Sequence, residues 1–277
     1  MKTMHPLDKT LALAHSDIRA GHFAGTMNQD YWNMVGPFGG TTAAIVLQSV
    51  LQHPDRLGDP VALTVNYAAA VGPGAFEVQA TPVRTNRSTQ HWMITLSQAD
   101  AQGHLQVTTT GTVVTAVRRE TWGANDLPMP DAPAPEAVPR LSIGPKGVAW
   151  LQRYEMRPVS GSIPTAWNGG GDHSETLMWL RDDPQRPLDF ASLAALADTF
   201  YPRVWLRRAT PVPIGTVSIT TYFHSDASLL AQVGSGYLLG RATGQQFRNG
   251  YFDQAAQLWS ETGALLVTSN QIVYFKE

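Results

Sequence analysis

The feature that most constrains this chain is an internal repetition, because its two halves carry the same kinds of segment in the same order. Each half opens with a short stretch of small residues typical of a buried helix, Gly39–Leu47 and Ala191–Asp198. Runs of β-branched and aromatic residues with partial two-residue alternation follow and predict extended strands. In the first half these runs are Val61–Tyr67, Phe76–Arg84, Gln90–Gln98 and Leu105–Val117, and in the second half they are Thr216–Phe223, Tyr237–Thr243, Phe252–Trp259 and Leu265–Phe275.

The turns between the last two strands of each half also correspond. Gly103 and Gly263 lie 160 positions apart at the end of similar four-residue turns, where a positive φ angle is expected. One helix with several antiparallel strands, occurring twice, predicts an α+β fold in which helices pack on a sheet. The alternative is a single irregular domain with chance similarity. The joint agreement of element order and turn position favours a duplication.

A proline-rich stretch separates the two halves. Five prolines lie between Pro128 and Pro139, and such a segment favours extended backbone and buries little surface. We therefore expect a first copy over residues 1–122, a linker over 123–145 and a second copy over 146–277.

Composition excludes several classes of protein. The 277 residues contain no cysteine, which rules out disulfide bonds, cysteine-ligated zinc and a cysteine nucleophile. A formal net charge of −2 argues against a nucleic-acid partner. The sequence shows neither a secretory signal nor an apolar run long enough to span a membrane, so we expect a cytoplasmic protein with no membrane partner.

The common cofactor and nucleophile motifs are missing. No nucleotide-binding glycine fingerprint, no histidine pair at i and i+4 and no Gly-x-Ser-x-Gly sequence occur. For the glycine-rich stretch over residues 168–173, a plain loop is a simpler explanation than a phosphate-binding loop. Asp172, His173 and Glu175 form one local group of hard ligands, for which a solvated turn is a simpler explanation than a metal site. We expect no cofactor and no metal, and hence chemistry carried by carboxylate, hydroxyl and amide groups.

Asp198 is the most unusual residue in the sequence. It falls on the alanine face of the second predicted helix, near a C-terminal end where the helix dipole disfavours a negative charge. An exposed aspartate at the helix end is the simple explanation. A buried acid in an apolar helix, however, is costly unless it is used, which favours a functional role.

Several motifs together resemble the acyl-CoA thioesterase II family, over nearly the whole chain. They are Gly36–Gly40, Arg84–Ser88, Leu196–Asp198, the strand from Thr216 to His224, and Thr268–Gln271. The resemblance implies a double hotdog, in which two helix-wrapped antiparallel sheets join into one continuous sheet. It also implies an enzyme of lipid metabolism that hydrolyses acyl-CoA to a free acid and CoA.

The resemblance places the catalytic set on Asp198, Thr216 and Gln271, which would position and deprotonate a water molecule. Gly39 and Gly40, at the start of the first helix, are candidates for oxyanion donors if that helix begins beside the acid. Arg203 and Arg207 are candidates for binding CoA phosphates, against the simpler explanation that they are exposed surface arginines.

The first copy carries Gln48 and Gly111 at the positions that match Asp198 and Gln271, so one hydrolytic site per chain is expected. A non-catalytic acyl-CoA-binding protein and, with less support, a hotdog hydratase or dehydratase are the alternatives. Further pairing of double-hotdog chains into a homo-oligomer stays open.

Overall fold

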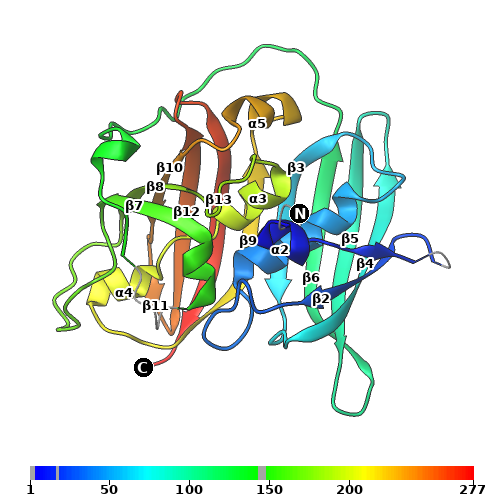
Figure 1. Ribbon diagram of the computed structural model, residues 1–277, viewed down its shortest axis with the longest axis horizontal. Helices are drawn as coiled ribbons and strands as arrows, with labels where there is room; N and C mark the ends of the chain where they lie inside the picture. Colours follow the sequence, from blue (N-terminus) through cyan, green and yellow to red (C-terminus); the bar gives the residue numbers. More distant parts are fainter. Residues whose placement is uncertain (1–3, 17–18, 143–147) are drawn as a thin grey trace.

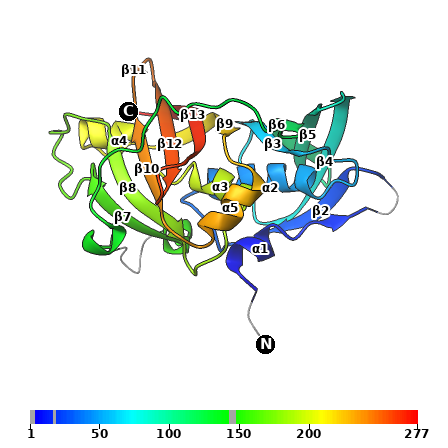
Figure 2. The ribbon, with the colours of Figure 1, turned by 90° about the horizontal axis from the view of Figure 1, so that it is seen from above.

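Two central helices organise the structure, a computed structural model that describes residues 4–16, 19–142 and 148–277. They are α2 (Gly39–Leu51) and α3 (Phe190–Leu196), which pack against each other. Both are buried almost all round, which explains why neither carries the charged face of a surface helix. Figure 1 shows the two helices side by side in front of the strands, and Figure 2 shows the strands curving around them.

A single antiparallel sheet surrounds these helices and, within the described part of the chain, comprises thirteen strands. The neighbours follow the order β1-β2-β4-β5-β6-β3-β9-β13-β12-β10-β8-β7, and β11 pairs with β12. The first six strands are β1 (Ala14–His15), β2 (His22–Met27), β3 (Asp59–Tyr67), β4 (Gly74–Thr85), β5 (Thr89–Ala99) and β6 (Leu105–Ala116). The others are β7 (Tyr154–Ser160), β8 (Thr176–Asp182), β9 (Ile214–Phe223), β10 (Leu238–Thr243), β11 (Phe247–Arg248), β12 (Tyr251–Ser260) and β13 (Leu265–Phe275).

The predicted α+β arrangement is confirmed. Each strand predicted from the sequence is present, with ends that shift by at most two residues. Gly103 and Gly263 close the expected hairpins with φ angles of 85° and 87°. Five strands were not predicted from the sequence, namely β1, β2, β7, β8 and β11, and neither were the short helices α1 (Pro6–Thr10), α4 (Arg203–Arg208) and α5 (Ala227–Val233). None of the helices in the described ranges is both long and apolar enough to cross a membrane.

The two halves join where β3 of the first half pairs with β9 of the second. The pairing runs antiparallel from Ala62 opposite Tyr222 to Asn66 opposite Ser218. Inside it, the hydroxyl oxygens of Thr64 and Thr220 lie 3.0 Å apart. Because this junction lies in the middle of the strand order, it makes one continuous sheet out of the two halves.

The proline-rich segment is mostly exposed, as expected, and a few of its residues anchor it to the second half. It crosses from the first half to the second in Figure 1, and its residue Val138 is buried against β8 and β10. The indole nitrogens of Trp179 and Trp259 donate hydrogen bonds to the carbonyl oxygens of Pro133 and Leu127, respectively. The division into copies at residues 122 and 145 stays a prediction, and the boundary between 145 and 146 lies outside the described residues.

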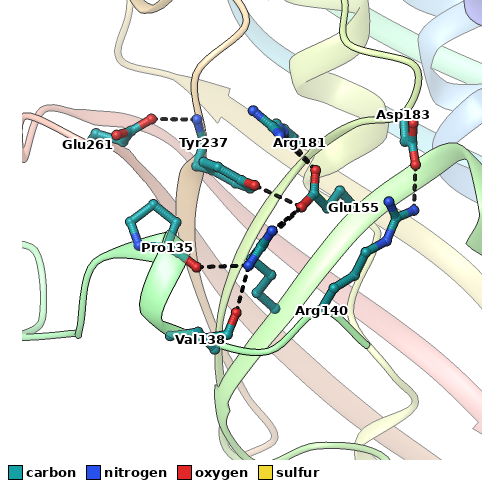
Figure 3. A network of polar contacts seen from close by, with 9 residues as sticks. Pro135, Val138, Arg140, Glu155, Arg181, Asp183, Tyr237 and Glu261 are labelled. Carbon is teal, nitrogen blue, oxygen red and sulfur yellow. Dashed lines mark hydrogen bonds and ion pairs between the residues drawn. The ribbon is translucent and has the colours of Figure 1, made fainter. Parts of the chain in front are cut away.

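Glu155 on β7 is the centre of a polar network that fixes this segment (Figure 3). Its carboxylate accepts hydrogen bonds from Tyr237, Arg181 and Arg157. Arg157 in turn donates to the carbonyl oxygens of two linker residues, Pro135 and Val138. The segment is therefore attached to the outer face of the sheet by directional contacts. Two short 3-10 helices, Pro135–Ala137 and Ala149–Arg153, lie in or near it.

Candidate active site

Asp198 lies in the turn directly after α3. The sequence predicted that the helix would extend over Ala191–Asp198, but it ends at Leu196, so the acid follows the helix instead of lying within it. Asp198 is only 9% exposed. Gln271 on β13 donates from Nε2 to Oδ1 of Asp198 over 2.6 Å, and the backbone amide of Gly40 donates to the same carboxylate.

This environment changes the acidity of Asp198. Burial raises the pKa of Asp198 from its ordinary 3.8 to about 7, and the hydrogen bonds from Gln271 and Gly40 lower it only in part. A pKa near the working pH is the most effective value for a group that takes a proton in the reaction. Asp198 is therefore suited to act as a general base.

The start of α2 lies directly against this carboxylate. A Cβ on Gly39 would lie 2.9 Å from Oδ2 of Asp198, and a Cβ on Gly40 would lie 2.6 Å from the carbonyl oxygen of Ala195. A side chain at Gly40 would push α2 away from the backbone of α3, and a side chain at Gly39 would crowd the Asp198 carboxylate. The Tyr67 hydroxyl donates to the carbonyl oxygen of Gly39 over 2.8 Å and ties β3 to the same point. Both halves of the chain therefore contribute to the surroundings of Asp198.

A cavity of about 80 Å³ opens beside the acid. Its polar lining consists of Asn33, Asp198, Thr216, Gln254 and Gln271. The structure thus brings the three predicted catalytic residues to one cavity. Its other lining residues are mostly apolar: Phe38, Gly39, Trp150, Phe200, Pro202, Ile214, Phe252 and Val273. The rings of Phe38 and Trp150 stack with their centres 4.3 Å apart and form one wall.

A larger hollow of about 400 Å³ adjoins this cavity. The two share Asn33, Gly39, Ile214 and Thr216 as lining residues. The larger hollow also contacts the turn over residues 68–70, which follows β3. Asp198 lines only the smaller of the two. We call the smaller one the inner cavity and the larger one the outer hollow, and together they form a two-part site.

Two sequence-family profiles cover most of the chain. The profile described as the acyl-CoA thioesterase C-terminal domain matches residues 126–275, more than half of the chain. The profile described as the N-terminal domain of the same family matches residues 28–116. The chain belongs to the acyl-CoA thioesterase family. None of the curated proteins matches the sequence.

Solved structures confirm the double-hotdog fold of this thioesterase-family chain. A conserved protein of unknown function with a hot dog fold, from Alicyclobacillus acidocaldarius, is 45% identical over 99% of both chains, with a TM-score of 0.91. A TesB protein from Mycobacterium avium subspecies paratuberculosis is 17% identical over 98% of both chains, with a TM-score of 0.79. An acyl-CoA thioesterase II from Mycobacterium marinum is 15% identical over 98% of both chains, with a TM-score of 0.76.

The structure does not bring the predicted arginines to the site of this thioesterase-family chain. Arg203 is fully buried, and its guanidinium donates to the carbonyl oxygens of Tyr201 and Ser174 and to the Thr176 hydroxyl. Burial lowers the pKa of Arg203 to about 9, although Tyr201 raises it in part. Its side chain is a structural cross-link and is not accessible to a CoA phosphate. Arg207 is exposed, bonds to the carbonyl oxygen of Gly171 and lines neither hollow.

The matching place in the first half is filled. Gly111 occupies the position that corresponds to Gln271, and a Cβ there would lie 2.8 Å from Cγ1 of Val46 on α2. Gln48, the counterpart of Asp198, lies within α2 itself. The first half therefore has neither the acid nor the space for an amide side chain at this position.

Several site residues were missed by the sequence analysis, namely Asn33, Phe38, Tyr67, Trp150 and Gln254. Gln254 had a readable signal, because it is the one polar residue among the alternating positions Phe252, Gln254, Ala256 and Leu258 of a predicted strand. Of the other four, Asn33 and Phe38 lie in the segment before α2, Tyr67 ends a strand and Trp150 lies in a short 3-10 helix, so no periodicity marks them. In the described ranges, no group of three or more acidic or histidine side chains is arranged to hold a metal.

Proposed function

We propose that this chain hydrolyses acyl-CoA thioesters through a water molecule activated by Asp198. The observation that carries the proposal is the buried Asp198 carboxylate, whose pKa is about 7 and which Gln271 holds at a cavity also lined by Thr216. A thioester carbonyl is already electrophilic, so a positioned base and a held water are sufficient chemistry.

Each residue has a definable role in this reaction. Asp198 takes a proton from the water as the water oxygen attacks the carbonyl carbon. The Nε2 atom of Gln271 fixes the carboxylate. The amide oxygen of Gln271 can accept a hydrogen bond from the water, and the Thr216 hydroxyl can either accept one or donate one. When the carbon–sulfur bond breaks, the CoA thiolate leaves and recovers the proton from Asp198.

Gly39 is the better of the two predicted oxyanion donors. The amide of Gly40 already donates to Asp198, whereas Gly39 lines both the inner cavity and the outer hollow. The positive end of the α2 dipole adds to the stabilisation of a negative oxygen at this place. We assign the outer hollow of about 400 Å³ to the pantetheine end of the substrate.

The alternatives predict different lining residues. A hydratase or dehydratase needs an acid and a histidine together, and no histidine lines either hollow. A protein that only bound acyl-CoA would gain nothing from a buried acid with a raised pKa, because a neutral side chain would be cheaper to bury.

The test is thiol release from a panel of acyl-CoAs of increasing chain length, with the wild type and Asp198→Asn. We expect kcat of Asp198→Asn to fall about 100-fold or more, the usual effect of removing a general base. Asp182→Asn is the matched control, since Asp182 is also a buried carboxylate with a raised pKa, but lines neither hollow. A wild type that binds these thioesters without releasing thiol is a binding protein, and the proposal fails.

A further inference from the structure

Gln254 is a buried amide that the proposed reaction has not used. It lies on β12 directly opposite Gln271 on β13, and both side chains line the inner cavity. Gln254 is 4% exposed. Cross-strand partners stand side by side on one face of a sheet, so the two amides are neighbours at the place where Asp198 is held.

The Gln254 side chain has no hydrogen-bond partner among the described residues. Its neighbour Gln271 differs in this respect, because Nε2 of Gln271 donates to Asp198. Burying an amide without a partner costs free energy, and folded proteins seldom leave such a group unsatisfied. The amide atoms of Gln254 are not among the fully enclosed polar atoms of the described residues, so they face the cavity, where a bound molecule can be their partner.

The repetition within the chain supplies an internal comparison. Ile94 on β5 lies opposite Gly111, just as Gln254 lies opposite Gln271, and each pair of corresponding residues is 160 positions apart. Ile94 is 1% exposed. An apolar side chain therefore meets the packing needs of this position, and the fold itself does not require an amide at residue 254.

We infer that the Gln254 amide is a further catalytic group, which donates from Nε2 to the carbonyl oxygen of the thioester. This inference rests on the proposed hydrolysis at the same site. As the water oxygen bonds to the carbonyl carbon, the carbonyl electron pair moves onto oxygen, where Gln254 and the Gly39 amide stabilise it. Collapse of this intermediate breaks the carbon–sulfur bond and gives the free acid and CoA.

Gln254 suits this role better than the other amides of the site. Nε2 of Gln271 is engaged by the carboxylate. Asn33 is only half-buried and also lines the outer hollow, so water reaches it. Gln254 is 4% exposed and lines the inner cavity but not the outer hollow, and a hydrogen bond from a buried donor is stronger than one from a donor exposed to solvent.

The first test replaces Gln254 by methionine, which keeps the size of the side chain and removes its donor. We expect Gln254→Met to lower kcat about 100-fold, the lower end of the effect of losing one oxyanion donor, with KM within about threefold of the wild type. Its melting temperature should equal or exceed that of the wild type, because the substitution removes an unpaired buried amide. Gln257→Met is the control, since Gln257 lies on the opposite face of β12 and should keep full activity.

Gln254→Glu separates donation from shape, because an ionised glutamate of the same size can only accept. It should lose at least as much kcat as Gln254→Met. If either Gln254 variant keeps the kcat of the wild type, the inference is wrong. The proposed function still stands in that case, provided that the wild type hydrolyses thioesters and Asp198→Asn lowers kcat. A lower melting temperature in Gln254→Met than in Gln257→Met also overturns it, since the amide would then have a structural partner. An inactive wild type rejects the proposed function itself.

Discussion

Asp198 is held at a place where a carboxylate is unstable. It follows the C-terminal end of α3, where the helix dipole is negative, and it is buried. Two donors compensate in part: the Gln271 amide and the backbone of Gly40 at the start of another helix. The pKa of Asp198 therefore lies close to neutral pH, and a small change in its surroundings changes the fraction of the carboxyl group that is ionised.

This acidity predicts how thioester hydrolysis depends on pH. The folded-state pKa of Asp198 is about 7, and only the ionised form can accept a proton. We therefore expect kcat/KM to be full above about pH 8 and to fall as the pH drops through about 7, with a slope of one proton. Steady-state thiol release between pH 5 and 9 measures this profile. A midpoint near pH 4 would contradict the burial that we ascribe to Asp198, and the residual rate of Asp198→Asn should lack the midpoint.

At the scale of elements, the site depends on how closely α2 approaches α3. The two adjacent glycines at the start of α2 leave room for the Asp198 carboxylate on one side and for the Ala195 carbonyl on the other. Both glycines were predictable from the sequence because small residues at a helix start allow close approach. Which of them donates to the acid was not predictable, since that depends on how the two helices cross.

Gly39→Ala tests this approach. The added methyl carbon would lie 2.9 Å from Oδ2 of Asp198 and 3.3 Å from the Tyr67 hydroxyl, so either the carboxylate or the start of α2 must shift. We expect kcat to fall about 100-fold, because misplacement by about 1 Å has an effect of that order. Gly72→Ala is the control, since its nearest neighbour would be 3.8 Å away. Equal activity of the two alanine variants would show that the start of α2 does not position the reaction.

The strands that the sequence analysis missed have a common physical cause. In β8, Leu177 and Trp179 on the outer face are buried against the proline-rich segment, so apolar side chains occupy both faces of the strand from Leu177 to Leu180. Without two-residue alternation, the run was not recognised as a strand. Strands with one exposed face, such as β4 and β5, were predicted correctly because their alternation survives.

Some of the functional residues were also predicted correctly from the sequence, and others were not. Asp198 was singled out by its place near a helix end, Thr216 and Gln271 were assigned through the family resemblance, and the structure brings all three to one cavity. Arg203 was misassigned because its sequence position after Pro202 does not reveal that β8 and β10 enclose it. Burial of a charged side chain is a property of tertiary packing, which a single sequence does not contain.

For the whole molecule, the network around Glu155 attaches the connecting segment to the second half. Burial raises the pKa of Glu155, but hydrogen bonds from Tyr237, Arg181 and Arg157 outweigh it and lower the pKa to about 2. The unfolded value is higher, so the ionised carboxylate stabilises the folded state. This stabilisation is complete above about pH 5 and is lost as the pH falls towards 2.

Glu155→Gln should therefore weaken the dependence of stability on acid. We expect the wild type to lose up to about 3 kcal/mol of unfolding free energy between pH 5 and pH 2 through this one group, and Glu155→Gln to lose correspondingly less. Urea denaturation at several pH values measures the difference. Glu136→Gln, in the exposed part of the same segment, should follow the wild-type curve. Parallel curves for Glu155→Gln and the wild type would contradict the assignment.

The pairing of β3 with β9 has a consequence for the behaviour of the protein in dilute solution. Gly39 and Tyr67 come from one half and Asp198 and Gln271 from the other, so the site exists only while this junction holds. Two separate subunits joined in this way would come apart on dilution. A covalent chain keeps the partner strand at a high effective concentration, which no dilution can reduce. The completeness of the site is therefore independent of how many copies of the protein are present.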